Sequence, residues 1–221
     1  MLQYNILFKK NDSQERMKHF GVLIEELNPD CICLQEVTTR LISALLEQPW
    51  ARGYHVSDPH LSLFKHHGVV VLSKFEIEEA WMVDFPTTMD RKLLGAKLKV
   101  FGKSLLVGTF HLASGRNSTQ QRKQQIEVIN KAFQGYTDVV LMGDTNISAS
   151  NENNFFDKKL KDMWLFLYCD QPGYTYADRA RLDRIYLTLN NLEPLEMRVV
   201  GKGTCISDHN GLFSTIKINS S

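Results

Sequence analysis

The chain has 221 residues, of which 43% are hydrophobic, and a formal net charge of +1. A chain of this length can bury a substantial core, and its apolar runs fall far short of the roughly 20 residues that cross a bilayer, which excludes a membrane-spanning protein. A net charge this close to zero excludes a histone-like surface that contacts phosphates all over. Any nucleic-acid partner would therefore be bound at one local site. No linker, repeat or low-complexity tract interrupts residues 1–221, and we therefore predict a single domain.

The start of the chain and the cysteines indicate in which cellular compartment the protein is expected. Met1 is followed by a short apolar segment without the basic start and long apolar stretch of a secretory signal, so we expect an intracellular protein of the nucleus or cytoplasm. The four cysteines, Cys31, Cys33, Cys169 and Cys205, lack metal-ligand spacing. We expect them to be reduced and inert thiols.

Strand and helix patterns alternate along the chain. A strand over residues 3–7 precedes a helix that opens on the capping box at residues 12–15 and ends before Asn28-Pro29. A strand at 31–35 then precedes a helix that starts near Thr39, and a third helix starts at Ser118. The remaining strands are predicted at residues 68–74, 77–83, 93–100, 104–111, 139–143, 181–187, 195–200 and 211–218.

Ten strands exceed one comfortable open sheet, and only a few helices are available to cover them. The economical arrangement for such an α/β chain is two sheets packed face to face with the helices on the outer surfaces. We therefore predict a sandwich.

Polar side chains stand at the ends of several predicted strands. The set is rich in oxygen and contains no cysteine: Asn5, Glu36, His111, Asp144 with Asn146, Asp183, and the pair Asp208-His209. Taken singly, each has an ordinary structural explanation as a solvated acid, a turn residue or a helix cap. Together they suit Mg²⁺, a hard cation that takes one or two carboxylates plus phosphate oxygens, with Glu36 and a second acid as ligands.

Four short motifs occur in the order that is typical of one enzyme family. They are Leu34-Gln35-Glu36, Gly143-Asp144-x-Asn146, Leu182-Asp183-Arg184 and Ser207-Asp208-His209, and Tyr4-Asn5 stands where that family opens with Trp-Asn. On these motifs the chain resembles the endonuclease/exonuclease/phosphatase family over nearly its whole length. The resemblance implies a four-layer α/β/β/α sandwich of the DNase I type, with two mixed sheets face to face and helices outside.

A narrower set of motifs resembles the branch of this family that releases tyrosine from 5′ ends of DNA. It comprises Phe85-Pro86-Thr87, Arg91-x-Leu93-Leu94, Thr109-x-His111-Leu112-x-Ser114, Gly143-Asp144-Thr145-Asn146, Tyr174-Thr175 and Arg181-Leu182-Asp183-Arg184-Ile185. This resemblance implies a phosphodiesterase dependent on Mg²⁺, or on Mn²⁺, that repairs the adducts left by type II topoisomerases. The implied partner is a 5′ DNA end that bears a tyrosyl group and is single-stranded or frayed. A monomer that binds no membrane is expected.

The resemblance also implies a role for each site residue. Asp144 would orient and deprotonate the attacking water beside Asn146, and Glu36, next to Asn5, would ligate the metal directly. Asp208 would help to place the metal and its waters. His209, held by Asp183, would donate to a non-bridging phosphate oxygen. Substrate contacts are expected from Arg91, His111, Ser114, Arg116, Tyr176 and Arg181, and further DNA contacts from Arg122, Lys123, Tyr174 and Arg179.

The chain departs from the family pattern at four positions. Ala113 replaces a typical Glu, Ser148 stands where a basic residue is frequent, and Tyr176 and Asn210 replace other aromatic residues. None of these belongs to the acid set. These departures affect substrate binding, because a missing Arg removes a bidentate phosphate contact.

Three other functions stay open at this point. The same fold serves abasic-site and other nucleases, and it serves phosphatases that act on phosphoinositides or sphingomyelin. Lipid-cleaving relatives usually add apolar docking loops. The sequence shows no such exposed cluster, although Trp50 and Trp81 could imitate one. A catalytically dead scaffold that binds DNA or protein is the third alternative, and the intact acid and histidine set argues against it.

Overall fold

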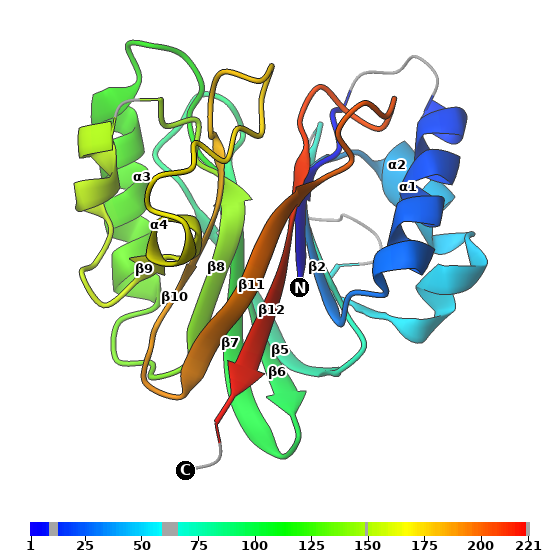
Figure 1. Cartoon of the computed structure of the whole chain (residues 1–221), viewed down its shortest axis with the longest axis horizontal. Coiled ribbons are helices and arrows are strands. Elements are labelled where there is room, and N and C mark those ends of the chain that lie inside the picture. Colours follow the sequence, from blue (N-terminus) through cyan, green and yellow to red (C-terminus); the bar gives the residue numbers. More distant parts are fainter. Residues whose placement is uncertain (9–12, 59–65, 149, 220–221) are drawn as a thin grey trace.

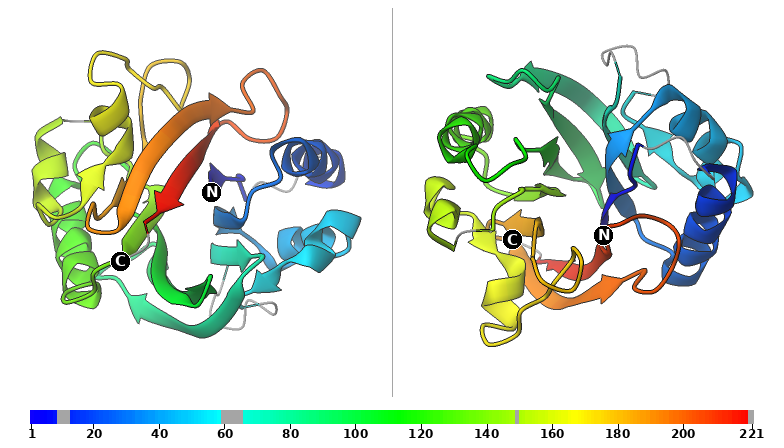
Figure 2. Two further views of the ribbon diagram at one scale, coloured as in Figure 1. Left: turned by 60° about the horizontal axis from the view of Figure 1, so that its bottom comes forward. Right: turned by 90° about the horizontal axis from the view of Figure 1, so that it is seen from above.

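Two six-stranded β-sheets packed face to face form the centre of the molecule (Figure 1). The computed structural model describes residues 1–8, 13–58, 66–148 and 150–219. Helices α1 (Ser13–Leu27) and α2 (Thr39–Leu46) lie outside one sheet and α3 (Thr119–Ala132) outside the other, which Figure 2 shows from two further sides. The predicted sandwich with outer helices is therefore confirmed.

The first sheet has the strand order β11-β12-β1-β2-β4-β3. Its strands are β11 (Leu192–Val200), β12 (Gly211–Ile218), β1 (Leu2–Asn5), β2 (Cys31–Val37), β4 (Gly68–Ser73) and β3 (His55–Val56). Strand β1 is short and central, and it runs parallel to β2 and antiparallel to β12.

The second sheet has the order β5-β6-β7-β8-β10-β9. Its strands are β5 (Glu76–Asp84), β6 (Lys92–Val100), β7 (Lys103–His111), β8 (Val139–Asp144), β10 (Asp183–Leu187) and β9 (Lys161–Asp162). Strands β7 and β8 are parallel. Of the twelve strands in the described residues, the sequence patterns identified ten. They missed β3, β9, helix α4 (Met163–Leu167) and two 3₁₀ turns, η1 (Pro49–Gly53) and η2 (Ser150–Phe155).

Three apolar layers hold the sandwich together. The middle layer lies between the sheets, and one outer layer lies under each set of helices. Alternation along β2 shows how one strand serves two layers: Cys31 and Cys33 face the other sheet, whereas Ile32 and Leu34 face α1 and α2. A strand buried on both faces has a nearly continuous apolar sequence, as residues 31–34 of β2 show.

The helices follow from local signals. Met17, Phe20 and Ile24 form the buried stripe of α1, and Thr38 caps α2 by accepting a hydrogen bond from the backbone N–H of Leu41 at 3.2 Å. Part of the capping box predicted at residues 12–15 lies outside the described residues. No helix in the described ranges is long and apolar enough to cross a membrane. All four cysteines are free thiols.

Four strands end at the same end of the molecule and place the predicted polar residues together. Asn5 ends β1 and pairs with Gln35 of β2, while His111 of β7 pairs with Asp144 of β8. Asp183 opens β10 opposite Asp144. Gly143 lets these strands approach closely, because a Cβ atom there would lie 2.3 Å from the backbone oxygen of Phe110.

Candidate active site

Asp144 is the centre of the polar cluster and is 1% exposed. Its Oδ2 accepts a hydrogen bond from Asn5 Nδ2 at 3.0 Å and lies 3.3 Å from His111 Nε2 and 3.8 Å from His209 Nε2. Its Oδ1 accepts from the backbone N–H of Asn146 at 2.9 Å. Burial and the nearby charge of Asp183 raise the pKa of Asp144 to about 7, against the lowering effect of His209. Asp144 can therefore exchange a proton near neutral pH.

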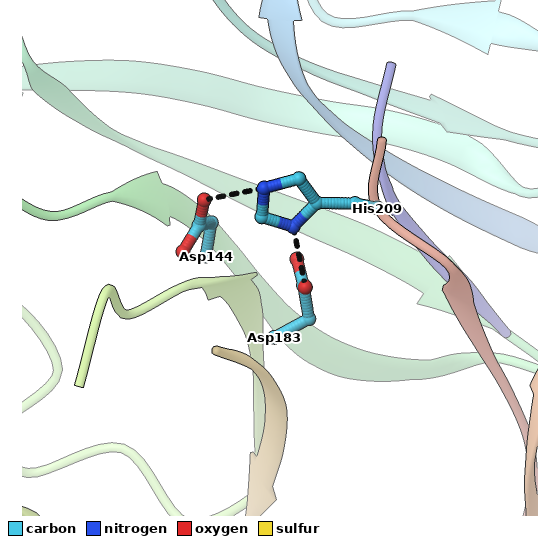
Figure 3. Close-up of side chains that lie close together, drawn as sticks. All are labelled: Asp144, Asp183 and His209. Carbon is cyan, nitrogen blue, oxygen red and sulfur yellow. Dashed lines mark hydrogen bonds and ion pairs between the residues drawn. The ribbon is translucent and has the colours of Figure 1, made fainter. Parts of the chain in front are cut away.

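His209 is held by Asp183 and points its other ring nitrogen toward Asp144 (Figure 3). Its Nδ1 lies 2.8 Å from Asp183 Oδ2, and Asp183 Oδ1 accepts from Gln3 Nε2 at 2.8 Å. Burial lowers the pKa of His209, but the charge and hydrogen bond of Asp183, with the charge of Asp144, outweigh burial and raise this pKa to about 10. His209 is therefore an imidazolium at neutral pH. The ring of Tyr176 packs against it, with the centroids 4.9 Å apart.

His111 has the opposite charge state. Burial, followed by the charge of Arg91, holds the pKa of His111 well below its usual value, so this ring is neutral. The guanidinium of Arg91 contacts Nδ1 of His111. A guanidinium can only donate, so Nδ1 accepts and the ring proton sits on Nε2, where it faces Asp144. Asp144 thus lies between one neutral and one charged histidine.

Glu36 lies on the first sheet beside this group and is half-buried. Its Oε1 accepts from Asn5 Nδ2 at 3.2 Å and its Oε2 from the backbone N–H of Phe8 at 3.0 Å. Asn5 Oδ1 accepts from the backbone N–H of Leu7 at 3.1 Å, which fixes the orientation of the amide. Asn5 therefore links Glu36 of one sheet to Asp144 of the other.

The donor atoms fit a hard divalent cation. Glu36, Asp144 and Asp183 bring carboxylate oxygens into one region. Burial and then the charge of Asp183 raise the pKa of Asp144, and a bound cation would favour its charged form. Atoms of Asp144, Asp183 and His209 all lie within 4.8 Å of one another, which is also a metal-like spacing. Both oxygens of Asp183 already accept hydrogen bonds and His209 is protonated, so we interpret that trio as a hydrogen-bonded relay.

Most of the predicted site residues lie around this centre, and the others lie in the loops nearby. Asn146 has a positive φ of 50° and donates from Nδ2 to the Leu112 oxygen at 3.1 Å. Ser114 is half-buried, with its hydroxyl 3.8 Å from Met89 Sδ. Asp208 and Arg116 are exposed, as are Lys123, Tyr174 and Arg179.

Two arginines do not lie where the sequence suggested. Arg122 is 2% exposed and binds Glu152 through Nε at 2.6 Å, so the expectation that it contacts DNA is wrong. Arg181 has a side chain that is 9% exposed and that pairs with Asp162 at 2.8 Å. A guanidinium held in this way supports the fold, and the geometry does not favour Arg181 as a substrate contact.

Several residues that shape the site were given no role from the sequence, although Gln35, Thr109 and Thr175 stood in its motifs. Gln3 Nε2 reaches both Gln35 Oε1, at 2.7 Å, and Asp183, and Gln35 Nε2 donates to Thr109 Oγ1 at 3.0 Å. Thr175 Oγ1 accepts from the backbone N–H of Asp183 at 3.1 Å. The available signal was alternation, because Gln3 and Asn5 share one face of a strand whose other residues are apolar.

Comparison with known proteins agrees with this geometry. The model of the endonuclease/exonuclease/phosphatase family matches residues 2–209. Tyrosyl-DNA phosphodiesterase 2 of Homo sapiens is 25% identical in an alignment of length 236 that covers 94% of this chain and 65% of that protein. The Danio rerio enzyme of the same name is 29% identical in an alignment of length 224 that covers 88% of this chain and 57% of that protein. This chain thus spans less than two thirds of these curated relatives.

Solved structures agree in fold. The crystal structure of Danio rerio TDP2 complexed with single strand DNA product matches with a TM-score of 0.84 at 23% identity, covering 98% of this chain and 97% of that chain. The match of the family model over most of the chain, with four motifs converging on one site, leads to one conclusion. The chain belongs to the endonuclease/exonuclease/phosphatase family.

Proposed function

We propose that this chain is a metal-dependent phosphodiesterase that hydrolyses 5′-phosphotyrosyl-DNA bonds and leaves a 5′ phosphate. The curated relatives that carry the name tyrosyl-DNA phosphodiesterase 2 support this choice of substrate. The observation that carries the proposal is the environment of Asp144. This buried carboxylate has a pKa of about 7 and lies between a neutral and a charged histidine.

The proposed reaction consumes one water. Asp144 orients this water and takes its proton as the oxygen attacks phosphorus, while Asn5 and the Nε2 proton of His111 hold the carboxylate in place. The bond from phosphorus to the tyrosyl oxygen breaks, and a phenolate leaves. The phenol has a pKa of about 10, so it is a better leaving group than an alkoxide.

His209 acts on the phosphate. Its Nε2 proton points into the site and donates to a non-bridging oxygen as negative charge builds there. Asp183 is a positioning residue, because it reaches the phosphate only through the ring of His209.

Glu36 would hold the divalent cation, with Asp208 helping to place it. When bound, the cation would neutralise negative charge on the phosphate. Asn5 and the backbone N–H of Phe8 orient the two oxygens of Glu36 before binding.

We assign substrate binding to the loops around the site. Arg91 keeps a buried Nε without a partner among the described side chains, and Ser114 and Arg116 follow the His111 strand end. Tyr174 is 42% exposed and offers a face for an unpaired base.

The test compares four substrates, one variant and its matched control. We expect the protein to prefer a 5′-phosphotyrosyl oligonucleotide over a 3′-phosphotyrosyl one, an abasic duplex and a phosphoinositide, in the presence of Mg²⁺. Glu36→Gln should weaken metal binding, because an amide is a poor ligand for a hard cation, whereas the exposed control Glu26→Gln should not. Preference for any other substrate rejects the proposal, and an inactive Glu36→Gln variant with unchanged metal affinity rejects the role of Glu36.

A further inference from the structure

Gln3 is a polar side chain in the apolar middle layer of the sandwich. It is 0% exposed, and strand alternation turns it towards the second sheet, whereas Tyr4 faces the helices. Its pairing neighbours Cys33 on β2 and Leu212 on β12 belong to the apolar core between the sheets. An apolar side chain would satisfy packing at this position, so the amide of Gln3 calls for another explanation.

The amide of Gln3 is used as a donor only. Its Nε2 donates to Asp183 Oδ1 at 2.8 Å and to Gln35 Oε1 at 2.7 Å, which uses both of its protons. Its Oε1 is buried and has no hydrogen-bond partner in the described part of the chain. Turning the amide over would direct this oxygen at the carboxylate of Asp183, and both groups can only accept. The fold therefore leaves one buried oxygen unsatisfied in order to present an N–H to Asp183.

The two oxygens of Asp183 face different partners. Oδ1 accepts from Gln3, and Oδ2 lies 2.8 Å from Nδ1 of His209 (Figure 3). The last torsion of an aspartate side chain is broad, so a carboxylate held at one oxygen can still rotate. The contact from Gln3 fixes the plane of this carboxylate. The plane in turn fixes the ring of His209, whose Nε2 lies 3.8 Å from Asp144 Oδ2.

Gln3 is itself held from the first sheet. The amide of Gln35 accepts from Gln3 through Oε1 and donates through Nε2 to Thr109 Oγ1 at 3.0 Å. Gln35 and Thr109 are both 0% exposed, so water does not compete for these contacts. The orientation of the Gln3 amide is thus fixed on one side by Gln35 and used on the other side by Asp183.

We propose that Gln3 is a positioning residue for the hydrolysis, because its amide holds Asp183 in the orientation that directs Nε2 of His209 at the phosphate. The inference rests on the proposed function, in which His209 donates to a non-bridging oxygen. A side chain that is 0% exposed cannot touch the substrate. Loss of the amide should therefore slow the chemical step and leave substrate binding unchanged.

Steady-state kinetics of two variants tests this separation. Gln3→Met keeps the size of the side chain and removes the donor, so kcat on a 5′-tyrosyl oligonucleotide should fall by about tenfold or more while KM stays within about twofold. Gln3→Asn keeps an amide that is too short to reach Asp183 and should behave alike. Thr188→Val is the control, because it removes a buried hydroxyl that accepts from the N–H of Val139 at 3.0 Å, at the far end of β8. An unchanged kcat in both Gln3 variants, or a loss confined to KM, overturns the proposal.

The proton on Nδ1 of His209 gives a readout that needs no substrate. Its low-field NMR resonance, identified by its loss in His209→Gln, should shift and broaden in Gln3→Met and Gln3→Asn, because Asp183 is no longer held. It should stay unchanged in Thr188→Val. An unchanged resonance in both Gln3 variants overturns the proposal. Since the comparison of four substrates alone decides the proposed function, a failure there is distinguished from a failure of the role of Gln3.

A double substitution shows whether Gln3 acts through Asp183. In the Asp183→Asn background, adding Gln3→Met should lower kcat by less than about twofold, because the charge that Gln3 orients is already gone. A full further loss of about tenfold would show that Gln3 acts elsewhere and overturn the proposal. If neither Gln3 variant folds, the side-chain amide protons of Gln3 decide: their shifts should change in Asp183→Asn, and unchanged shifts overturn the proposal.

Discussion

Two histidines touch the same carboxylate and carry different charges, because their second ring nitrogens meet different partners. Nδ1 of His209 meets the carboxylate of Asp183, whereas Nδ1 of His111 meets the guanidinium of Arg91. The sequence identified both histidines from their motifs. The family resemblance also paired His209 with Asp183. The partner of His111 could not be predicted, because Arg91 lies 20 residues away along the chain and meets this ring only in the folded state.

Replacing Asp183 tests the relay at the residue scale. Asp183→Asn removes the charge that keeps His209 protonated, so kcat on a 5′-tyrosyl oligonucleotide should fall by about 100-fold while KM changes little. The exposed Asp178→Asn is a matched control and should behave as wild type. Steady-state kinetics at one Mg²⁺ concentration measures both constants. A loss below about threefold would show that Asp183 does not act through His209.

The neutral state of His111 predicts how stability depends on pH. Because the folded pKa of His111 lies well below its usual value, the unfolded chain takes up a proton near pH 6.5 that the folded chain does not. The free energy of unfolding should therefore decrease as the pH falls below about 6.5. His111→Gln removes this dependence, so its stability should fall less steeply between about pH 6.5 and 5. Urea unfolding across this range measures the slopes, and equal slopes would contradict the prediction.

At the scale of elements, α3 ties two loops of the site together through one side chain. Arg122 binds both oxygens of Glu152 in η2, at 2.6 and 2.8 Å, and its Nη1 donates to the backbone oxygens of Ala113 and Gly115 at 3.0 and 2.9 Å. Gln125 accepts from the backbone N–H of Ala113 at 2.8 Å. The loop that carries Ser114 is therefore fixed from α3.

Arg122→Met should leave Glu152 as a buried charge without its partner and lower the free energy of unfolding by about 3–5 kcal/mol. Adding Glu152→Leu should restore part of this loss, because the uncompensated charge is then gone. Lys123→Met, at the exposed neighbouring position, serves as the control. Urea unfolding of the four proteins is the measurement. A loss below about 1 kcal/mol in Arg122→Met would mean that water reaches Glu152.

Element prediction succeeded where a periodic pattern was long and failed where it was short. Strand β3 and strand β9 have two residues each, and α4 has five, which leaves no period to detect. Helix α3 itself was predicted, but the wrong expectation that Arg122 contacts DNA was avoidable. Arg122, Gln125, Ile126 and Ile129 share the buried face at helical spacing. The order of strands in each sheet could not be predicted from the sequence, since it depends on contacts between distant segments.

At the scale of the whole molecule, the charge of +1 limits how DNA can be held. We expect few phosphate contacts, so the logarithm of DNA affinity should fall with the logarithm of salt concentration with a slope no steeper than about −3. Arg116→Ala should reduce the magnitude of the slope by about one contact. Fluorescence anisotropy of a labelled single strand at several salt concentrations gives both slopes. A slope near −6, or no change in Arg116→Ala, would contradict this view.

Asn5 spans the two sheets, and this has a consequence for how the molecule becomes active. Its partners Glu36 and Asp144 are 31 and 139 residues away along the chain, and the neighbouring contact from Gln3 to Asp183 spans 180. Contacts of such long range form late, because the loops that they close cost the most entropy. A chain that has folded the first sheet alone can form the contact from Asn5 to Glu36, but it lacks the contacts to Asp144 and Asp183 and has no assembled site. Newly made or partly unfolded copies of this protein therefore lack the candidate active site until the two sheets have docked.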